Sequence, residues 1–152
     1  MDQRLKWDAA VYAGLVAGVL ATLVELALWA LFTHALPQVF FRDARFAAAI
    51  LMGRAALDAG FGWRLILVAT MVHFALSVTY GVILSWLIQR LRARSSLIMG
   101  AGFGLLLYGL NMYGFTIVFP WFEGARDWIT LTAHLSFGIV AAGAYRVLAK
   151  RA

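Results

Sequence analysis

The chain has 152 residues, of which 64% are hydrophobic and 13% are charged, with a net charge of +6 and no cysteine. Soluble domains carry about a quarter charged residues, so this composition is typical of a membrane protein. The length leaves room for at most four or five membrane-spanning helices of about 20 residues each. A large extramembrane catalytic domain is therefore excluded within this chain, as are disulfides, iron–sulfur clusters and cysteine nucleophiles.

Four apolar stretches are long enough to cross a bilayer core of about 30 Å at 1.5 Å per residue. They cover residues 9–32, 65–88, 97–119 and 128–148. We expect each to be a helix, because lipid offers no partner to free backbone groups and the chain lacks the alternating strands of a barrel. The first stretch is too long for a signal peptide, so we expect it to remain as a helix. The predicted fold is all-α, an integral membrane four-helix bundle formed by residues 1–152 as a single domain.

The connection between the first two spans contains an apolar segment that is too short to cross a membrane. We predict a short interfacial helix there, from Phe46 to Leu57, lying along the membrane surface. Charged residues just before it resemble an ion-pair cluster that contacts lipid headgroups, with an anionic ligand as the alternative. These residues are Arg42, Asp43 and Arg45.

The distribution of lysine and arginine predicts how the chain is oriented, because positive residues concentrate on the cytoplasmic side. Eight fall on the side of the two termini: Arg4, Lys6, Arg90, Arg92, Arg94, Arg146, Lys150 and Arg151. Five fall on the opposite side: Arg42, Arg45, Arg54, Arg64 and Arg126. We therefore expect a multi-pass protein of a bacterial inner membrane with both termini in the cytoplasm. The basic residues flank apolar spans, so they indicate lipid contacts and no nucleic-acid partner.

The two halves of the chain share a spacing of small and polar residues. The first and third spans each carry two glycines and then a polar residue: Gly14, Gly18 and Glu25, and Gly100, Gly104 and Asn111. The second and fourth spans each carry a histidine followed seventeen residues later by an arginine: His73 and Arg90, and His134 and Arg151. This pattern predicts a two-helix internal repeat, with chance as the alternative because glycine is abundant. We expect the four glycines to let the helices pack closely.

Four polar side chains are predicted to lie at one depth: Glu25, His73, Asn111 and His134. At 1.5 Å per residue, each lies roughly 22 to 25 Å from the cytoplasmic boundary, in the outer third of the bilayer. Glu25 is the only acidic residue in the four spans. A charge at such a depth costs about 2.5 to 3.5 kcal/mol on insertion scales, which makes it a functional candidate. It needs a partner, and the two histidines are the nearest by depth.

Several interpretations of this polar layer are open. It could bind or transport a small ion or solute, because glutamate and histidine together change charge near physiological pH; transport would then need a homo-oligomer or a larger membrane complex. The two histidines could instead ligate a haem, or join Glu25 in a divalent metal site, His73, His134 and Glu25. The layer could also be interhelical hydrogen bonding alone, in a non-catalytic assembly subunit.

Catalytic motifs are not found in the sequence. It contains no serine in a nucleophile elbow, no paired carboxylates beside a cleft and no phosphate-binding glycine loop, so we expect no enzyme and no catalytic residue. Asp127 precedes the fourth span, and we predict that it is the N-cap of that helix.

Three segments resemble a group of small, largely uncharacterised bacterial inner-membrane proteins with four helices. They are GLVAGVLATLVE, HFALSVTYG and NMYGFTIVFPWFEGARDWITLTAHLSFG. Some members of similar appearance carry the label sodium:proline symporter. Proteins of that transporter class are several times longer and have broken helices, so the resemblance implies a fold and a location and carries no functional residues to this chain.

Overall fold

The computed structural model describes residues 5–150, and within that range the backbone is almost entirely helical and has no strand. Four segments are long and apolar enough to cross a membrane: α1 (Trp7–Phe32), α3 (Trp63–Ile88), Ala93–Ile117 and α5 (Trp128–Leu148). The predicted all-α membrane bundle is confirmed, and the chain is a membrane protein. Arg4 and Arg151, which entered the orientation and repeat predictions, lie outside the described residues.

The helix between the first two spans differs from the prediction at both ends. Instead of Phe46 to Leu57, α2 covers Leu36–Met52 and is followed by a separate 3-10 turn, η1 (Arg54–Leu57). Pro37 lies in its first turn, where the missing N–H is not needed. Gly53 ends it with φ of 78°, a left-handed conformation that favours glycine. The prediction followed the apolar run alone and passed over these two end signals.

The third span also differs from a continuous helix over residues 97–119. It begins as α4 (Ala93–Gly109), widens into a π turn, η2 (Leu110–Gly114), and tightens into a 3-10 turn, η3 (Phe115–Ile117). The loop before α5 forms a further 3-10 helix, η4 (Pro120–Ala125). Because single π turns inside helices occur frequently at functional sites, η2 marks Asn111 as a residue of interest.

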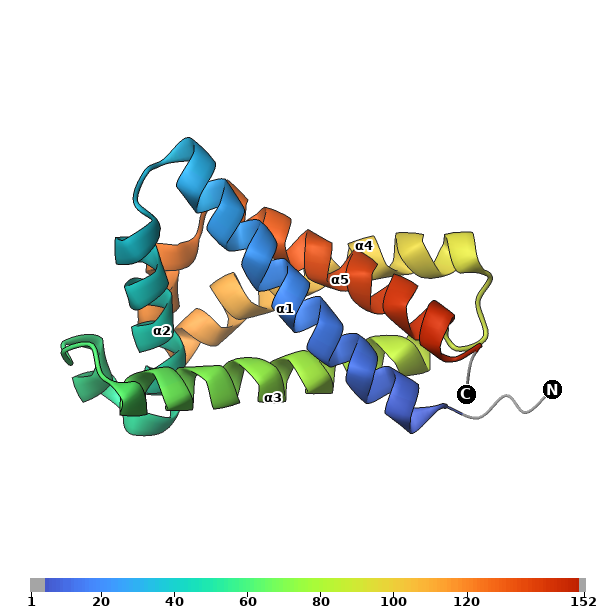
Figure 1. The fold of residues 1–152 in the computed structure, drawn as a ribbon, viewed down its shortest axis with the longest axis horizontal. Coiled ribbons are helices and arrows are strands. Elements are labelled where there is room, and N and C mark those ends of the chain that lie inside the picture. Colours follow the sequence, from blue (N-terminus) through green and yellow to red (C-terminus); the bar gives the residue numbers. More distant parts are fainter. Residues whose placement is uncertain (1–4, 151–152) are drawn as a thin grey trace.

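The packing of the helices places α2 across one end of the bundle. Helix α1 packs between α3 and α5, and α4 packs against the other side of α5. In Figure 1, α2 crosses the end at which α1 finishes and α3 begins, while the start of α1 and the finish of α5 lie at the opposite end. The main core is buried between the spans and contains Leu84, Ile88, Phe103, Phe137 and Tyr145. A second, smaller core lies beneath α2 and contains Ala44, Ala48, Ala49, Leu65 and Ala69.

The four predicted packing glycines all lie at helix–helix contacts. A Cβ added at Gly14 or Gly18 would meet Ser77 of α3, and one added at Gly104 would meet the backbone of His134 on α5. At Gly100 it would overlap the carbonyl oxygen of Gly138 on α5. The two glycines of each half thus face the helix that carries the histidine of the same half. The internal repeat itself stays a prediction.

We expect Gly100→Ala to destabilise the protein, because its methyl group would overlap the Gly138 carbonyl. Overpacking of this kind costs about 1 to 3 kcal/mol. Gly102→Ala is the matched control on the same helix, since a Cβ there has no neighbour within 4 Å. Thermal unfolding in detergent should show a lower midpoint for Gly100→Ala than for Gly102→Ala, and equal midpoints would contradict the close contact between α4 and α5.

Candidate functional site

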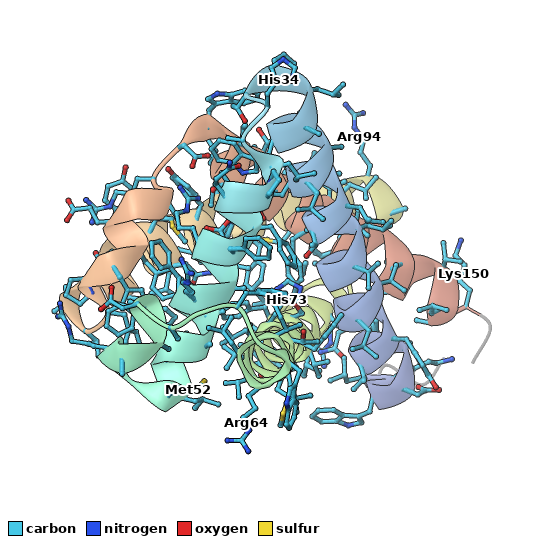
Figure 2. The ribbon with its side chains drawn as sticks, turned by 60° about the vertical axis from the view of Figure 1, so that its left-hand side comes forward. His34, Met52, Arg64, His73, Arg94 and Lys150 are labelled. Atoms are coloured by element: carbon cyan, nitrogen blue, oxygen red, sulfur yellow. The ribbon has the colours of Figure 1, made fainter. Side chains whose placement is uncertain are left out.

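Three adjoining cavities lie in the half of the bundle near α2. The largest, about 370 Å³, is enclosed by α1, α2 and α3. Two smaller ones, about 170 and 200 Å³, extend towards α5 and η2. Glu25 and His73 are the only described residues that line all three. Figure 2 shows His73 in the interior between α1 and α2, whereas Arg64 and Lys150 lie at the periphery.

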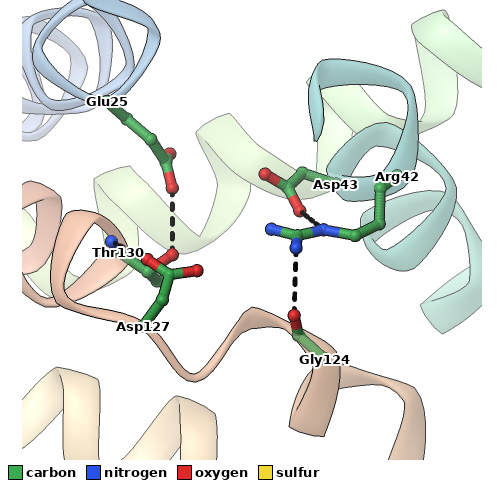
Figure 3. A network of polar contacts seen from close by, with 6 residues as sticks. All are labelled: Glu25, Arg42, Asp43, Gly124, Asp127 and Thr130. Carbon is green, nitrogen blue, oxygen red and sulfur yellow. Dashed lines mark hydrogen bonds and ion pairs between the residues drawn. The ribbon is translucent and has the colours of Figure 1, made fainter. Parts of the chain in front are cut away.

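Glu25 points from α1 into this space, as Figure 3 shows. Its carboxylate accepts one long hydrogen bond, of 3.3 Å, from the hydroxyl of Thr130 on α5. The sequence predicted a histidine partner, but neither histidine is hydrogen-bonded to it. Within residues 5–150 it also forms no ion pair. Glu25 is therefore a carboxylate beside open volume with a single weak bond.

Asp43 brings a second carboxylate to the same place from α2. It lines the largest cavity together with Glu25, and Figure 3 shows both carboxylates directed towards one space. The Nε atom of Arg42 lies 2.8 Å from its Oδ1 atom. Burial raises the pKa of Asp43 above its ordinary value, and the adjacent Arg42 guanidinium lowers it in part. Asp43 is thus a charged group of the site that sequence reasoning assigned to the membrane surface.

The guanidinium of Arg42 is held by protein groups on several sides. It donates to the carbonyl oxygen of Gly124 at 3.0 Å and lies 5.6 and 5.8 Å from the ring centres of Trp29 and Phe46. Arg45 likewise donates to the carbonyl oxygen of Ala59 at 3.0 Å. These contacts lie within the protein, and contact of the cluster with lipid headgroups stays a prediction.

A chain of four hydrogen bonds connects four of the helical segments. The Tyr80 hydroxyl on α3 donates to the Asn111 Oδ1 atom at 3.0 Å, and the Asn111 amide lies 3.1 Å from the Nε2 atom of His134. The Nδ1 atom of His134 lies 2.8 Å from the carbonyl oxygen of Thr130, whose hydroxyl donates to Glu25. This pattern assigns a neutral ring to His134, with Nδ1 as donor and Nε2 as acceptor.

The two histidines have different surroundings. Both ring nitrogens of His134 take part in the chain of hydrogen bonds, which locks its ring. His73 lies outside that chain: its Nε2 atom is 3.4 Å from the hydroxyl of Thr22, and its ring meets that of Phe74 edge-on at 5.1 Å. Of the two imidazoles, His73 is the one that faces the largest cavity.

The same geometry bears on the haem and metal interpretations. Ligation through His134 would break one of its two hydrogen bonds, and its ring is held by both. Among residues 5–150, no three histidine, aspartate or glutamate side chains are grouped so that they could hold a metal ion. Those interpretations gain no support from the geometry and stay predictions.

Sequence reasoning identified part of this site and missed part of it. It selected Glu25, His73, Asn111 and His134, which the structure places on adjoining cavities. It missed Tyr80 and Thr130, since a hydroxyl in an apolar span carries no distinctive signal. It also missed the inward position of Asp43. The predicted N-cap is confirmed: the Asp127 carboxylate accepts a hydrogen bond of 2.8 Å from the backbone N–H of Thr130.

Comparison of the chain with protein-family models, with curated proteins and with solved structures finds no match. The resemblance to small bacterial membrane proteins is therefore untested. No function follows for the chain from these comparisons.

Replacing Arg42 tests the electrostatic coupling at α2. We expect Arg42→Gln to raise the pKa of Asp43 further, because the guanidinium is the group that opposes the effect of burial. The protonated carboxyl can be followed by infrared titration, with its band assigned by Asp43→Asn. Arg45→Gln is the matched control, since Arg45 bonds the Ala59 carbonyl. An unchanged titration in Arg42→Gln, or an equal change in both variants, would refute the coupling.

Proposed function

We propose that this membrane protein binds a small solute in the cavity between α1, α2 and α3, and that the charge of Glu25 controls binding. The observation that carries the proposal is that Glu25 and His73 together line all three adjoining cavities. The largest cavity, about 370 Å³, falls within the usual range for ligand sites of about 300 to 1,000 Å³. Its walls are mainly apolar with a few convergent polar groups, as such sites are.

Interhelical hydrogen bonding explains only part of the polar layer. Asn111 and His134 bond each other and their neighbours, so their polar atoms are satisfied inside the bundle. Glu25 and His73 face open volume, and their side-chain hydrogen bonds, to Thr130 and Thr22, are 3.3 and 3.4 Å long. Placing a carboxylate inside a span is costly, and one weak hydrogen bond recovers little of that cost. A bound solute would supply the missing interactions.

Proton exchange gives the site a way to couple binding to pH. The charged or titratable groups near Glu25 are Asp43 and Arg42 of α2, His73 of α3, Asp127 before α5 and His134 of α5. When a solute approaches, the carboxyl or the imidazole can release or take up a proton to balance its charge. Transport would add a release step on the other side of the membrane, for which four helices would need a homo-oligomer or a larger complex.

Solute binding is tested by thermal unfolding of the purified protein with a panel of small aromatic cations, neutral compounds and anions. We expect at least one charge class to raise the Tm of the wild type by several degrees, because a ligand that binds only the folded state stabilises it. Glu25→Gln should abolish that increase. Glu123→Gln, which changes an exposed carboxylate in η4, should retain it. The proposal fails if no class stabilises the wild type, or if Glu25→Gln responds as the wild type does.

We also propose that the chain lies in a bacterial inner membrane with both termini in the cytoplasm. The excess of basic residues at the end of the bundle opposite α2 supports this orientation. Because the chain has no cysteine, single cysteines report on it cleanly.

In spheroplasts, a membrane-impermeant maleimide should label Gly60→Cys, in the exposed connection after α2, at once. Arg92→Cys, in the exposed connection before α4, should be labelled only after permeabilisation. The reverse pattern would show that the orientation is opposite.

A further inference from the structure

The largest cavity has exposed apolar residues at its margin, on α1 and α2. Three of its lining residues are also well exposed on the outer surface: Val19 at 45%, Leu23 at 54% and Phe40 at 38%. Val19 and Leu23 belong to a membrane-spanning helix, where an exposed apolar side chain faces acyl chains. A ligand that enters here comes from the lipid, so it has an apolar part that partitions into the membrane.

The inner wall of this cavity favours a positive charge on the ligand. Glu25 and Asp43 both line it, and no lysine or arginine does among the residues that the structure describes. The one guanidinium nearby, that of Arg42, is bonded to Asp43, so the two carboxylates share one counterion. The cavity wall also includes the ring of Phe74, and aromatic faces attract organic cations.

A metal cation does not suit the same wall. Divalent cations such as calcium take six to eight oxygen ligands, and the described residues contain no group of three acidic or histidine side chains arranged for a metal. The mainly apolar lining favours an organic ion, whose carbon atoms can contact it.

We infer that the cavity binds an amphiphilic ammonium compound. The inference rests on the proposed function and adds the ligand class. The ammonium group lies against Glu25. The apolar part extends towards Val19 and Leu23 at the margin of the cavity.

Four probes that share one phenyl ring separate these features. They are 2-amino-1-phenylethanol, 2-phenylethylamine without the hydroxyl, 2-phenylethanol without the amine, and phenylacetate as the anion. Dissociation constants are measured by calorimetry at pH 7 with the full chain in detergent. We expect wild type to bind 2-amino-1-phenylethanol and 2-phenylethylamine more tightly than 2-phenylethanol, and phenylacetate weakest.

One variant assigns the contact with the ammonium group. Glu25→Gln should weaken both amines at least about tenfold and leave 2-phenylethanol unchanged, which also shows that the variant is folded.

The other outcomes overturn the inference in distinct ways. If 2-phenylethanol or phenylacetate binds tightest and loses affinity in Glu25→Gln, the ligand class is wrong and the proposed function stands. If wild type binds none of the four, the inference fails, and the wider panel decides the proposed function. If Glu25→Gln leaves every constant unchanged, both fail.

Discussion

The close approach of α1 to α3 is the constraint on which the site depends. Gly18 permits it, because a Cβ there would come within 2.6 Å of the Ser77 Oγ atom and 3.2 Å of the His73 Nε2 atom. Without that space the imidazole would have to turn away or α3 would have to retreat, and either change would separate His73 from Glu25. In lipid, where apolar contact alone does not hold helices together, such backbone proximity is a main source of association. Packing and site geometry therefore have one cause.

The two halves of the chain share a residue spacing, but the polar residues at matching positions form different hydrogen bonds. In the second half, Asn111 lies in the π turn of η2 and bonds His134 directly, so the amide and the imidazole satisfy each other. In the first half, Glu25 and His73 occupy the matching positions, yet each faces a cavity and bonds a hydroxyl at long distance. The second pair connects helices, whereas the first is available to a ligand. The same spacing in the two halves thus places one polar pair in contact with each other and the other pair in contact with threonine hydroxyls.

The sequence predicted the spans and the inward position of the polar residues, because hydropathy and a 100° rotation per residue are local properties. It did not predict that α2 begins at Leu36, since the amphipathic pattern there is short and the proline that starts the helix resembles a loop signal. The bond between Thr130 and Glu25 joins residues 105 positions apart, and no local pattern specifies such a contact. In the π turn, Asn111 bonds Tyr80 of α3 and His134 of α5, and such distant contacts leave no local signal, so the third span was predicted as one regular helix.

Helix α2 is part of the site as well as a cover for one end of the bundle. It is attached to the loop before α5 by two bonds: Trp121 Nε1 donates to the Phe46 carbonyl at 3.1 Å, and Arg42 donates to the Gly124 carbonyl. These bonds hold the Asp43 carboxylate opposite Glu25, where burial and the neighbouring guanidinium act on its pKa in opposite directions. The exposed apolar residues at the margin of the cavity lie on α1 and on α2 itself. The attachment of this amphipathic helix therefore places both a carboxylate and part of the apolar margin at the cavity.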